Sequence, residues 1–320
     1  MRYSIILTVH NDEKRLPDCA AALLAQPCQD LEILLVEYGS SDGSQMLCQG
    51  YQAAYPERVR AIVSGSGDAR NEGIRCARGA YLLFLDCGMV LRNDALALLS
   101  DQIEGSRSDL YLLETRETGS GEPRTLEQEP ELLLEAAKKP AALWRRQLFD
   151  DAYLRFPEES GYAQERMLCK GMARSRSIVR VPQNIFRSIA PPEEKTPERE
   201  LAVLDALDDV RSYLVRHGLL DCCRASLCRL SALLICDRAC AVLTNKQDTA
   251  CLSECIQYLQ GRFPDYRSIS MPQWRGCQTE KLLELMAQGR WTRLRMTCLV
   301  RGRDGKERKQ TTPQRGRTKG

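Results

Sequence analysis

Polar and acidic side chains stand directly after short apolar runs in the first 90 residues of the chain. The runs are residues 3–9, 33–36 and 81–85, and the residues that follow them include His10, Asn11, Glu37, Gly39, Ser40, Asp42 and Asp86. Since the carboxyl ends of parallel strands meet at one edge of a sheet, these residues would converge there. Their carboxylates can accept hydrogen bonds from a ligand or coordinate a cation. We therefore predict a ligand-binding crevice at a sheet edge.

The elements that would position these side chains alternate along the first third of the chain. Strand patterns lie at 3–9, 31–36, 59–63 and 81–85, and helical patterns at 12–25, 44–55, 68–78 and 93–103. Such alternation with short connections predicts an α/β fold with a mainly parallel, helix-covered sheet. Further on we predict strands at 110–114 and 178–181, the second at a sheet edge, and helices at 142–149 and 164–173.

Three segments in this region, Tyr3–Asn11, Leu35–Ser44 and Ala69–Gly73, together resemble the family 2 glycosyltransferases. Those enzymes use nucleotide-sugar donors and have the GT-A fold. The resemblance spans residues 3–190 and implies a GT-A nucleotide-sugar-binding domain of the bacterial polysaccharide type. It also implies transfer of a sugar from a nucleotide-diphosphate sugar to a polysaccharide or lipid-linked acceptor, with inversion.

The resemblance assigns the donor site residue by residue. His10, Asn11, Glu37, Gly39, Ser40 and Asp42 would hold the base and ribose, and Arg70, Asn71 and Arg187 would lie near the nucleotide or its phosphates. Tyr38 replaces an acidic residue of the family and could stack on a ring. A purely structural interpretation stays open: residues 39–43 could form a tight turn in which Asp42 caps the next helix.

The metal motif of the family departs most from its pattern here. Where the family often has Asp-Ser-Asp-Asp, this chain has Asp86-Cys87-Gly88-Met89. Asp86 alone keeps a carboxylate, because Cys87 is a poor ligand for hard cations and the next two residues offer no side-chain oxygen. Asp86 is thus the one candidate metal ligand and a candidate catalytic residue. We expect binding of Mg²⁺ or Mn²⁺ to be weak or absent.

The position at which the family has its general base also carries a different residue in this chain. The segments 143–146 and 154–159 resemble the acceptor side of the family, which leads to a Glu-Asp pair. Arg166 occupies the position of the Asp and cannot accept a proton at neutral pH. Glu165 is the candidate base, and the alternative is a helix-surface acid paired with Lys170 or Arg166. A second hypothesis follows: an impaired transferase that binds nucleotide or glycan and acts as a scaffold.

Other chemistries find little support in the sequence. The chain has two histidines, His10 and His217, so few members are available for a Ser-His-Asp or histidine metal site. The sequence has no Walker-type motif and no Gly-x-Gly-x-x-Gly after the first strand. We therefore do not expect a P-loop or a dinucleotide-binding fold.

The 15 cysteines are scattered through the chain. One group invites attention, with two pairs each one helical turn apart: Cys236, Cys240, Cys251 and Cys255. On facing helices these residues could form disulfides or a thiolate metal site. We favour packing in an apolar core, since free cysteine behaves as a small buried hydrophobe.

Prolines and charge divide the chain. We predict a GT-A domain at 1–190, a linker at 191–197, a helical domain at 198–292 with breaks at Gly218 and 244–248, and a basic disordered tail at 293–320. Residues 301–320 contain eight Lys or Arg and two acids, which gives this segment a net charge of +6. The whole chain has a net charge of +3, so the rest of the chain is negatively charged. The tail could attract an anionic membrane surface, with nucleic acid a less favoured partner, or it could be solvated without a partner.

No apolar run approaches the ~18 residues that a membrane span needs. The start of the sequence lacks the charged-then-apolar order of a signal peptide. We therefore expect a cytoplasmic protein, peripheral at the inner face of the membrane if the tail binds there.

Overall fold

The computed structural model describes residues 1–65, 69–113, 122–138, 140–157, 161–189, 201–245 and 249–298. The chain divides into two compact units, each considered separately below. The first consists of Met1–Glu198 and Asp209–Cys223, and the second of Arg199–Asp208 and Arg224–Gly320. The predicted linker at 191–197 lies outside the described residues.

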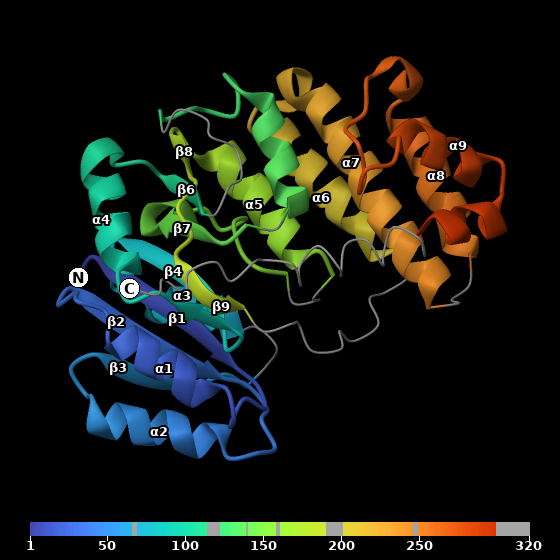
Figure 1. Cartoon of the computed structure of the whole chain (residues 1–320). Coiled ribbons are helices and arrows are strands. Elements are labelled where there is room, and N and C mark those ends of the chain that lie inside the picture. The colour runs from blue at the N-terminus through green and yellow to red at the C-terminus, as the bar shows by residue number, and fades with distance from the viewer. Residues whose placement is uncertain are drawn as a thin grey trace, which may run out of the picture. The chain divides into compact units, whose positions relative to one another are not determined.

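Strands and helices alternate along the N-terminal part of the chain (Figure 1). The strands are β1 (Tyr3–Val9), β2 (Leu31–Glu37), β3 (Val59–Val63), β4 (Tyr81–Asp86), β5 (Met89–Leu91), β6 (Leu110–Leu113), β7 (Ala142–Arg145), β8 (Ile178–Val181) and β9 (Phe186–Ile189). The helices are α1 (Leu16–Leu24), α2 (Ser44–Ala54), α3 (Ala69–Cys76), α4 (Ala95–Ser106) and α5 (Ala163–Arg174), with 3₁₀ helices η1 (Pro130–Lys138) and η2 (Arg146–Asp150).

Seven of the described strands form one sheet in the order β3-β2-β1-β4-β7-β6-β8. The first four are parallel, β7 is antiparallel to both of its neighbours, and β8 lies at an edge, as predicted. The chain places β2 on one side of β1 and β4 on the other. This is a topological switch point, where open α/β sheets form a crevice at the carboxyl ends of their strands.

Helices cover both faces of the sheet, which explains why the strand sequences are continuously apolar. All seven residues of β1 and of β2 are buried. Alternate residues of β1, from Tyr3 to Val9, pack in one cluster with apolar side chains of α1 and α4. Ile6 points to the opposite face, where α3 lies against it. The expectation of a helix-covered parallel sheet is confirmed.

The helix predicted at 142–149 is wrong. Residues Ala142–Arg145 form β7, and Arg146–Asp150 form a 3₁₀ helix. β7 fills the position between β4 and β6, pairing Trp144 with Leu82 on one side and with Leu110 on the other. A four-residue apolar run fits either structure locally, and the pairing with two neighbouring strands decided in favour of the strand.

The C-terminal part of the chain is helical, as predicted. Its helices are α6 (Ala202–Arg216), α7 (Leu220–Thr244), α8 (Ala250–Arg262) and α9 (Thr279–Ala287), with a 3₁₀ turn η3 (Tyr266–Ser268). The break at Gly218 is confirmed and has a φ of +69°, a conformation that favours glycine. The second unit contains the four cysteines that are spaced one helical turn apart in two sets, namely Cys236, Cys240, Cys251 and Cys255. None of the four forms a disulfide, and each is at most 7% exposed, as expected for packing in a core.

Residues 291–298 are also helical, with Leu294 and Cys298 buried. The predicted start of the tail at 293 is therefore wrong, because these buried residues pack as part of a helix. The rest of the predicted tail, from residue 299 onward, lies outside the described residues. None of the helices described is both long and apolar enough to cross a membrane.

Candidate active site

The carboxyl ends of β1 and β4 meet at Thr8 and Asp86, which are paired in the sheet register. Thr8 Oγ1 donates a hydrogen bond of 2.6 Å to Asp86 Oδ1. Arg70, in the first turn of α3, donates to the same oxygen at 3.2 Å. Desolvation disfavours the charged carboxylate, but the charge of Arg70 and these hydrogen bonds outweigh it, so the pKa of Asp86 is lowered. Asp86 is therefore an anion at neutral pH.

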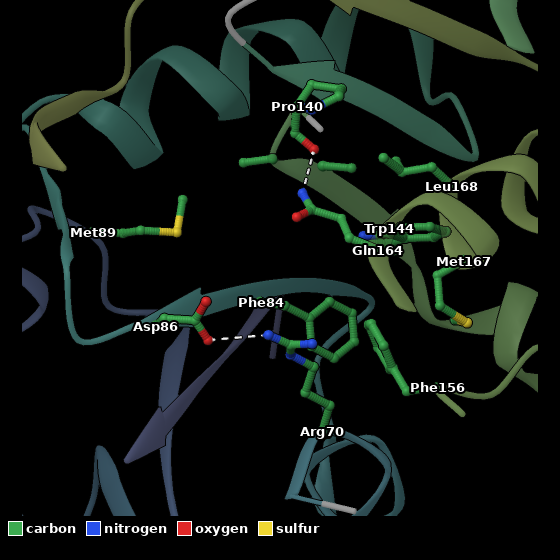
Figure 2. Close-up of a pocket in the computed structure, with 12 residues that line it drawn as sticks. Arg70, Phe84, Asp86, Met89, Pro140, Trp144, Phe156, Gln164, Met167 and Leu168 are labelled. Atoms are coloured by element: carbon green, nitrogen blue, oxygen red, sulfur yellow. Dashed lines mark hydrogen bonds and ion pairs between the residues drawn. The ribbon is translucent and has the colours of Figure 1, made fainter. Parts of the chain in front are cut away.

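A cavity opens beside this ion pair. Its lining residues are Arg70, Phe84, Asp86, Met89, Pro140, Ala141, Ala142, Trp144, Phe156, Gln164, Met167 and Leu168. Figure 2 shows Arg70 and Asp86 facing each other, with the Phe156 ring beside the guanidinium. The other walls are mainly aromatic and aliphatic, so the ion pair and the Gln164 amide supply the polarity.

The predicted nucleoside-binding residues lie together at the carboxyl ends of β1 and β2. Asn11 adopts a left-handed conformation with φ of +54°. Its N–H donates to Ser40 Oγ at 3.1 Å, and its Oδ1 accepts the N–H of Ser41 at 2.8 Å. Glu37 is buried and accepts the N–H of Ser40 at 2.6 Å. The loop at 38–41 is thus fixed by its neighbours before any ligand binds.

Asp42 has the structural role that the sequence left open. Its carboxylate accepts the N–H of Ser44, the first residue of α2, at 3.0 Å and the N–H of Glu13 at 3.1 Å. Asp42 precedes the N-cap residue Gly43, and its two hydrogen bonds tie the first residue of α2 to the loop after β1. Asp42 and Gly39 are both exposed.

His10 and Tyr38 form a stacked pair, with ring centroids 4.9 Å apart and planes 19° apart. His10 Nδ1 also lies 2.7 Å from the Tyr38 carbonyl oxygen. The pKa of Tyr38 is raised, first by desolvation and then by the negative charge of Asp86. The negative charge of Asp86 therefore acts on Tyr38 in the loop after β2.

Asn71 does not face the cavity, although it was predicted to bind substrate. It is 8% exposed, and its side-chain amide makes two hydrogen bonds to the backbone of Phe156, at 2.8 and 2.9 Å. Asn71 therefore fixes Phe156 in the cavity wall. Arg187 is exposed on β9 and does not line the cavity.

Glu165, the predicted base, is buried at 3% exposure and does not line the cavity. Arg166 and Lys170, which follow it on the same helix, form ion pairs with Asp209 at 3.2 and 2.7 Å. Gln164 is the residue of this first turn of α5 that faces the cavity, where it donates to the Pro140 carbonyl at 3.1 Å (Figure 2). Successive helical residues point about 100° apart, and on α5 the direction toward the cavity falls on Gln164 and not on Glu165.

The residues after β4 do not fit a Mg²⁺ or Mn²⁺ site built from protein ligands. Cys87 is 3% exposed, and its Sγ contacts the Thr8 carbonyl at 3.6 Å. Met89 offers the cavity a soft thioether, while hard cations prefer oxygen ligands. Among the described residues no group of three or more His, Cys, Asp or Glu could hold a metal.

Sequence reasoning missed most of the apolar wall. Phe84, Met89 and Met167 come from three different elements, and nothing in their local pattern distinguishes them from core residues. A signal existed for Phe156 and Trp144, since both lie in segments that resemble the acceptor side of the family. Thr8 could have been found as the residue paired with Asp86 in adjacent parallel strands.

Comparison with known proteins agrees with the fold and with the resemblance found in the sequence. The family model for glycosyl transferase family 2 matches residues 4–169. The uncharacterized glycosyltransferase EpsJ of Bacillus subtilis is 30% identical over 183 residues, which cover 51% of this chain and 53% of EpsJ. The poly(ribitol-phosphate) beta-N-acetylglucosaminyltransferase TarS of Staphylococcus aureus is 25% identical over 180 residues, covering 52% of this chain and 31% of TarS.

The chain thus spans about half the length of EpsJ and about a third of TarS. A crystal structure of S. aureus TarS 1–349 in complex with UDP-GlcNAc has a similar fold, with a TM-score of 0.67 at 18% identity. That match covers 95% of this chain and 92% of the TarS chain. Sequence motifs, sheet topology and these comparisons agree, and the chain belongs to glycosyl transferase family 2.

Proposed function

We propose that this protein transfers a sugar from a nucleotide-diphosphate sugar to a polysaccharide or lipid-linked acceptor, with inversion at the anomeric carbon. The nucleoside would bind the loop formed by Asn11, Gly39 and Ser40, beside the stacked His10–Tyr38 pair. The diphosphate would lie toward Arg70, and the sugar would enter the apolar cavity. TarS, a relative, is a transferase whose structure was solved with UDP-GlcNAc, which supports a nucleotide-sugar donor here.

The observation that carries this proposal is the ion pair of Arg70 and Asp86 at the mouth of the cavity, at the carboxyl ends of the strands. In an inverting transfer the acceptor hydroxyl attacks the anomeric carbon as the bond to the diphosphate breaks. The hydroxyl proton passes to a base, and the leaving diphosphate needs positive charge nearby.

A second candidate function is nucleotide or glycan binding without turnover. It is favoured by the amide of Gln164, which cannot act as a base where it faces the cavity, and by the burial of Glu165. The Asp86 carboxylate is already paired with Arg70. A protein of this kind would act as a scaffold or partner of an active transferase.

Parallel assays separate the two functions. Donor hydrolysis and transfer are measured with UDP-, GDP- and dTDP-sugars, with and without Mn²⁺, and nucleotide binding is measured by calorimetry on the same preparation. Turnover with any donor supports the transferase. Binding of a nucleotide without turnover favours the scaffold, and absence of both rejects the two proposals.

Attraction of the basic residues 301–320 to an anionic membrane surface would place either protein at the cytoplasmic face, near lipid-linked acceptors. This proposal follows from the net charge of +6 in that segment. Co-sedimentation with vesicles containing phosphatidylglycerol, compared between the full chain and one truncated after residue 298, tests it. Equal binding of both would reject it.

A further inference from the structure

We propose that Arg70 provides the positive charge that faces the diphosphate in this protein, and that Asp86 is a positioning residue that holds its guanidinium. Charge neutralisation would then come from the side chain instead of from a divalent cation held by carboxylates. The inference rests on the proposed binding of a nucleotide diphosphate and specifies how that group is bound.

The first support is the way in which Asp86 is already engaged. Its Oδ1 accepts hydrogen bonds from both Thr8 and Arg70, at 2.6 and 3.2 Å. A cation at this oxygen would have to replace the guanidinium, and its positive charge would be repelled by the arginine. Neither Cys87 nor Met89 supplies an oxygen to compensate for that loss.

The second support is that the Arg70 side chain is held in place but not fully used. A guanidinium has five N–H donors, and within the described part of the chain one hydrogen bond to Asp86 is its polar contact. Its side chain is 33% exposed and lines the cavity. Several donors therefore remain available to phosphate oxygens, which match the planar fork of arginine.

The third support is the device that fixes the orientation of Arg70. Its guanidinium lies over the Phe156 ring, 5.1 Å from the centroid. Asn71, the next residue on α3, binds both backbone groups of Phe156. The helix that carries the arginine thus also holds the ring that supports it. Figure 2 shows the Phe156 ring beside the Arg70 guanidinium, which faces Asp86. Such preorganisation reduces the entropy lost on binding.

The effect of Asp86→Asn on nucleotide binding distinguishes this arrangement from a metal site. If Asp86 held a cation, Asp86→Asn would abolish nucleotide binding. If Asp86 only orients Arg70, the amide can still accept the guanidinium hydrogen bond. Removing the negative charge beside the diphosphate would then leave the affinity equal or raise it several-fold.

Calorimetric titration with UDP, GDP and dTDP, each in EDTA and in Mn²⁺, tests the proposal on the full chain. We expect one of these nucleotides to bind in EDTA with an affinity that Mn²⁺ changes little. Arg70→Gln should weaken this binding about 10- to 100-fold, the range for lost hydrogen bonds to a charged group. Arg70→Lys should lose less, because it keeps the charge without the fork.

The matched control is Arg75→Gln, which removes an arginine from the same helix. Arg75 is 67% exposed, pairs with Glu72 and does not line the cavity, so its loss should leave nucleotide affinity unchanged. Thermal unfolding of each variant checks that α3 is intact.

Nucleotide binding that requires Mn²⁺ and is lost in Asp86→Asn would overturn the inference while leaving the proposed function in place. Binding in EDTA that Arg70→Gln does not weaken would also overturn it. If no nucleotide binds with or without Mn²⁺, the proposed function fails and the inference fails with it.

Discussion

Two glycines in helices offer a test of how α3 is seated on the sheet. A Cβ added at Gly73 would lie 2.4 Å from Ile6 Cγ2, on the buried central strand β1. A Cβ added at Gly50, in α2, would meet no atom within 4 Å. Both positions are helical, so Gly→Ala should gain a similar helix propensity of about 0.5–1 kcal/mol at each.

The overlap at Gly73 sets the difference between the two variants. Contacts below 3.0 Å require Ile6 or the helix to move, and Ile6 is fully buried. Overpacking of this kind costs about 1–3 kcal/mol. We therefore expect Gly50→Ala to be more stable than the parent by about 0.5–1 kcal/mol. We expect Gly73→Ala to be less stable than Gly50→Ala by about 1–3 kcal/mol.

Urea unfolding followed by far-ultraviolet circular dichroism gives both free energies on the same footing. The comparison cancels the helix-propensity term and isolates the packing of α3 on β1. If Gly73→Ala is stabilised as much as Gly50→Ala, the close approach of α3 to β1 is refuted. The position of Arg70 at the cavity would then also be in doubt, since the same helix carries it.

Three further expectations concern the cavity. Asn71→Ala removes two hydrogen bonds to the Phe156 backbone and should lower the free energy of unfolding by about 1–3 kcal/mol, whereas Asn93→Ala, at an exposed position, should change it by at most about 0.5 kcal/mol. Gln164→Ala should raise the KM for the sugar donor more than Glu165→Gln does, because of these two residues only Gln164 lines the cavity. If Glu165→Gln instead lowers kcat about 10²–10⁴-fold, Glu165 is the general base. The pKa of Asp86 is lowered by folding from its ordinary value of 3.8, so its ion pair stabilises the fold above that pH and is lost as the pH falls through the lower, folded pKa. The stability advantage of the parent over Asp86→Asn should therefore be complete at neutral pH, and the two acid titration curves should converge below about pH 4.

The sequence by itself determined the elements whose signals are local. The apolar runs at β1 and β2 can be buried on both faces only in a helix-covered sheet, and they predicted it correctly. The location of Asp86 at the edge of the sheet could also be predicted, because it ends β4 and parallel strands bring their carboxyl ends to one edge. The cysteines at 236 and 240 were also predicted correctly, since burial follows from the apolar residues around them.

Tertiary structure alone decided which side chains reach the cavity. Neighbouring residues of one helical turn differ in direction by about 100°, and the phase of α5 is fixed by its packing, so Gln164 faces the cavity and Glu165 does not. Asn71 contacts a backbone 85 residues away, a partner that no local pattern can specify. β7 became a strand because β4 and β6 supplied hydrogen-bond partners on both sides. Contacts between remote segments depend on the packing of the whole unit, which local residue preferences do not encode.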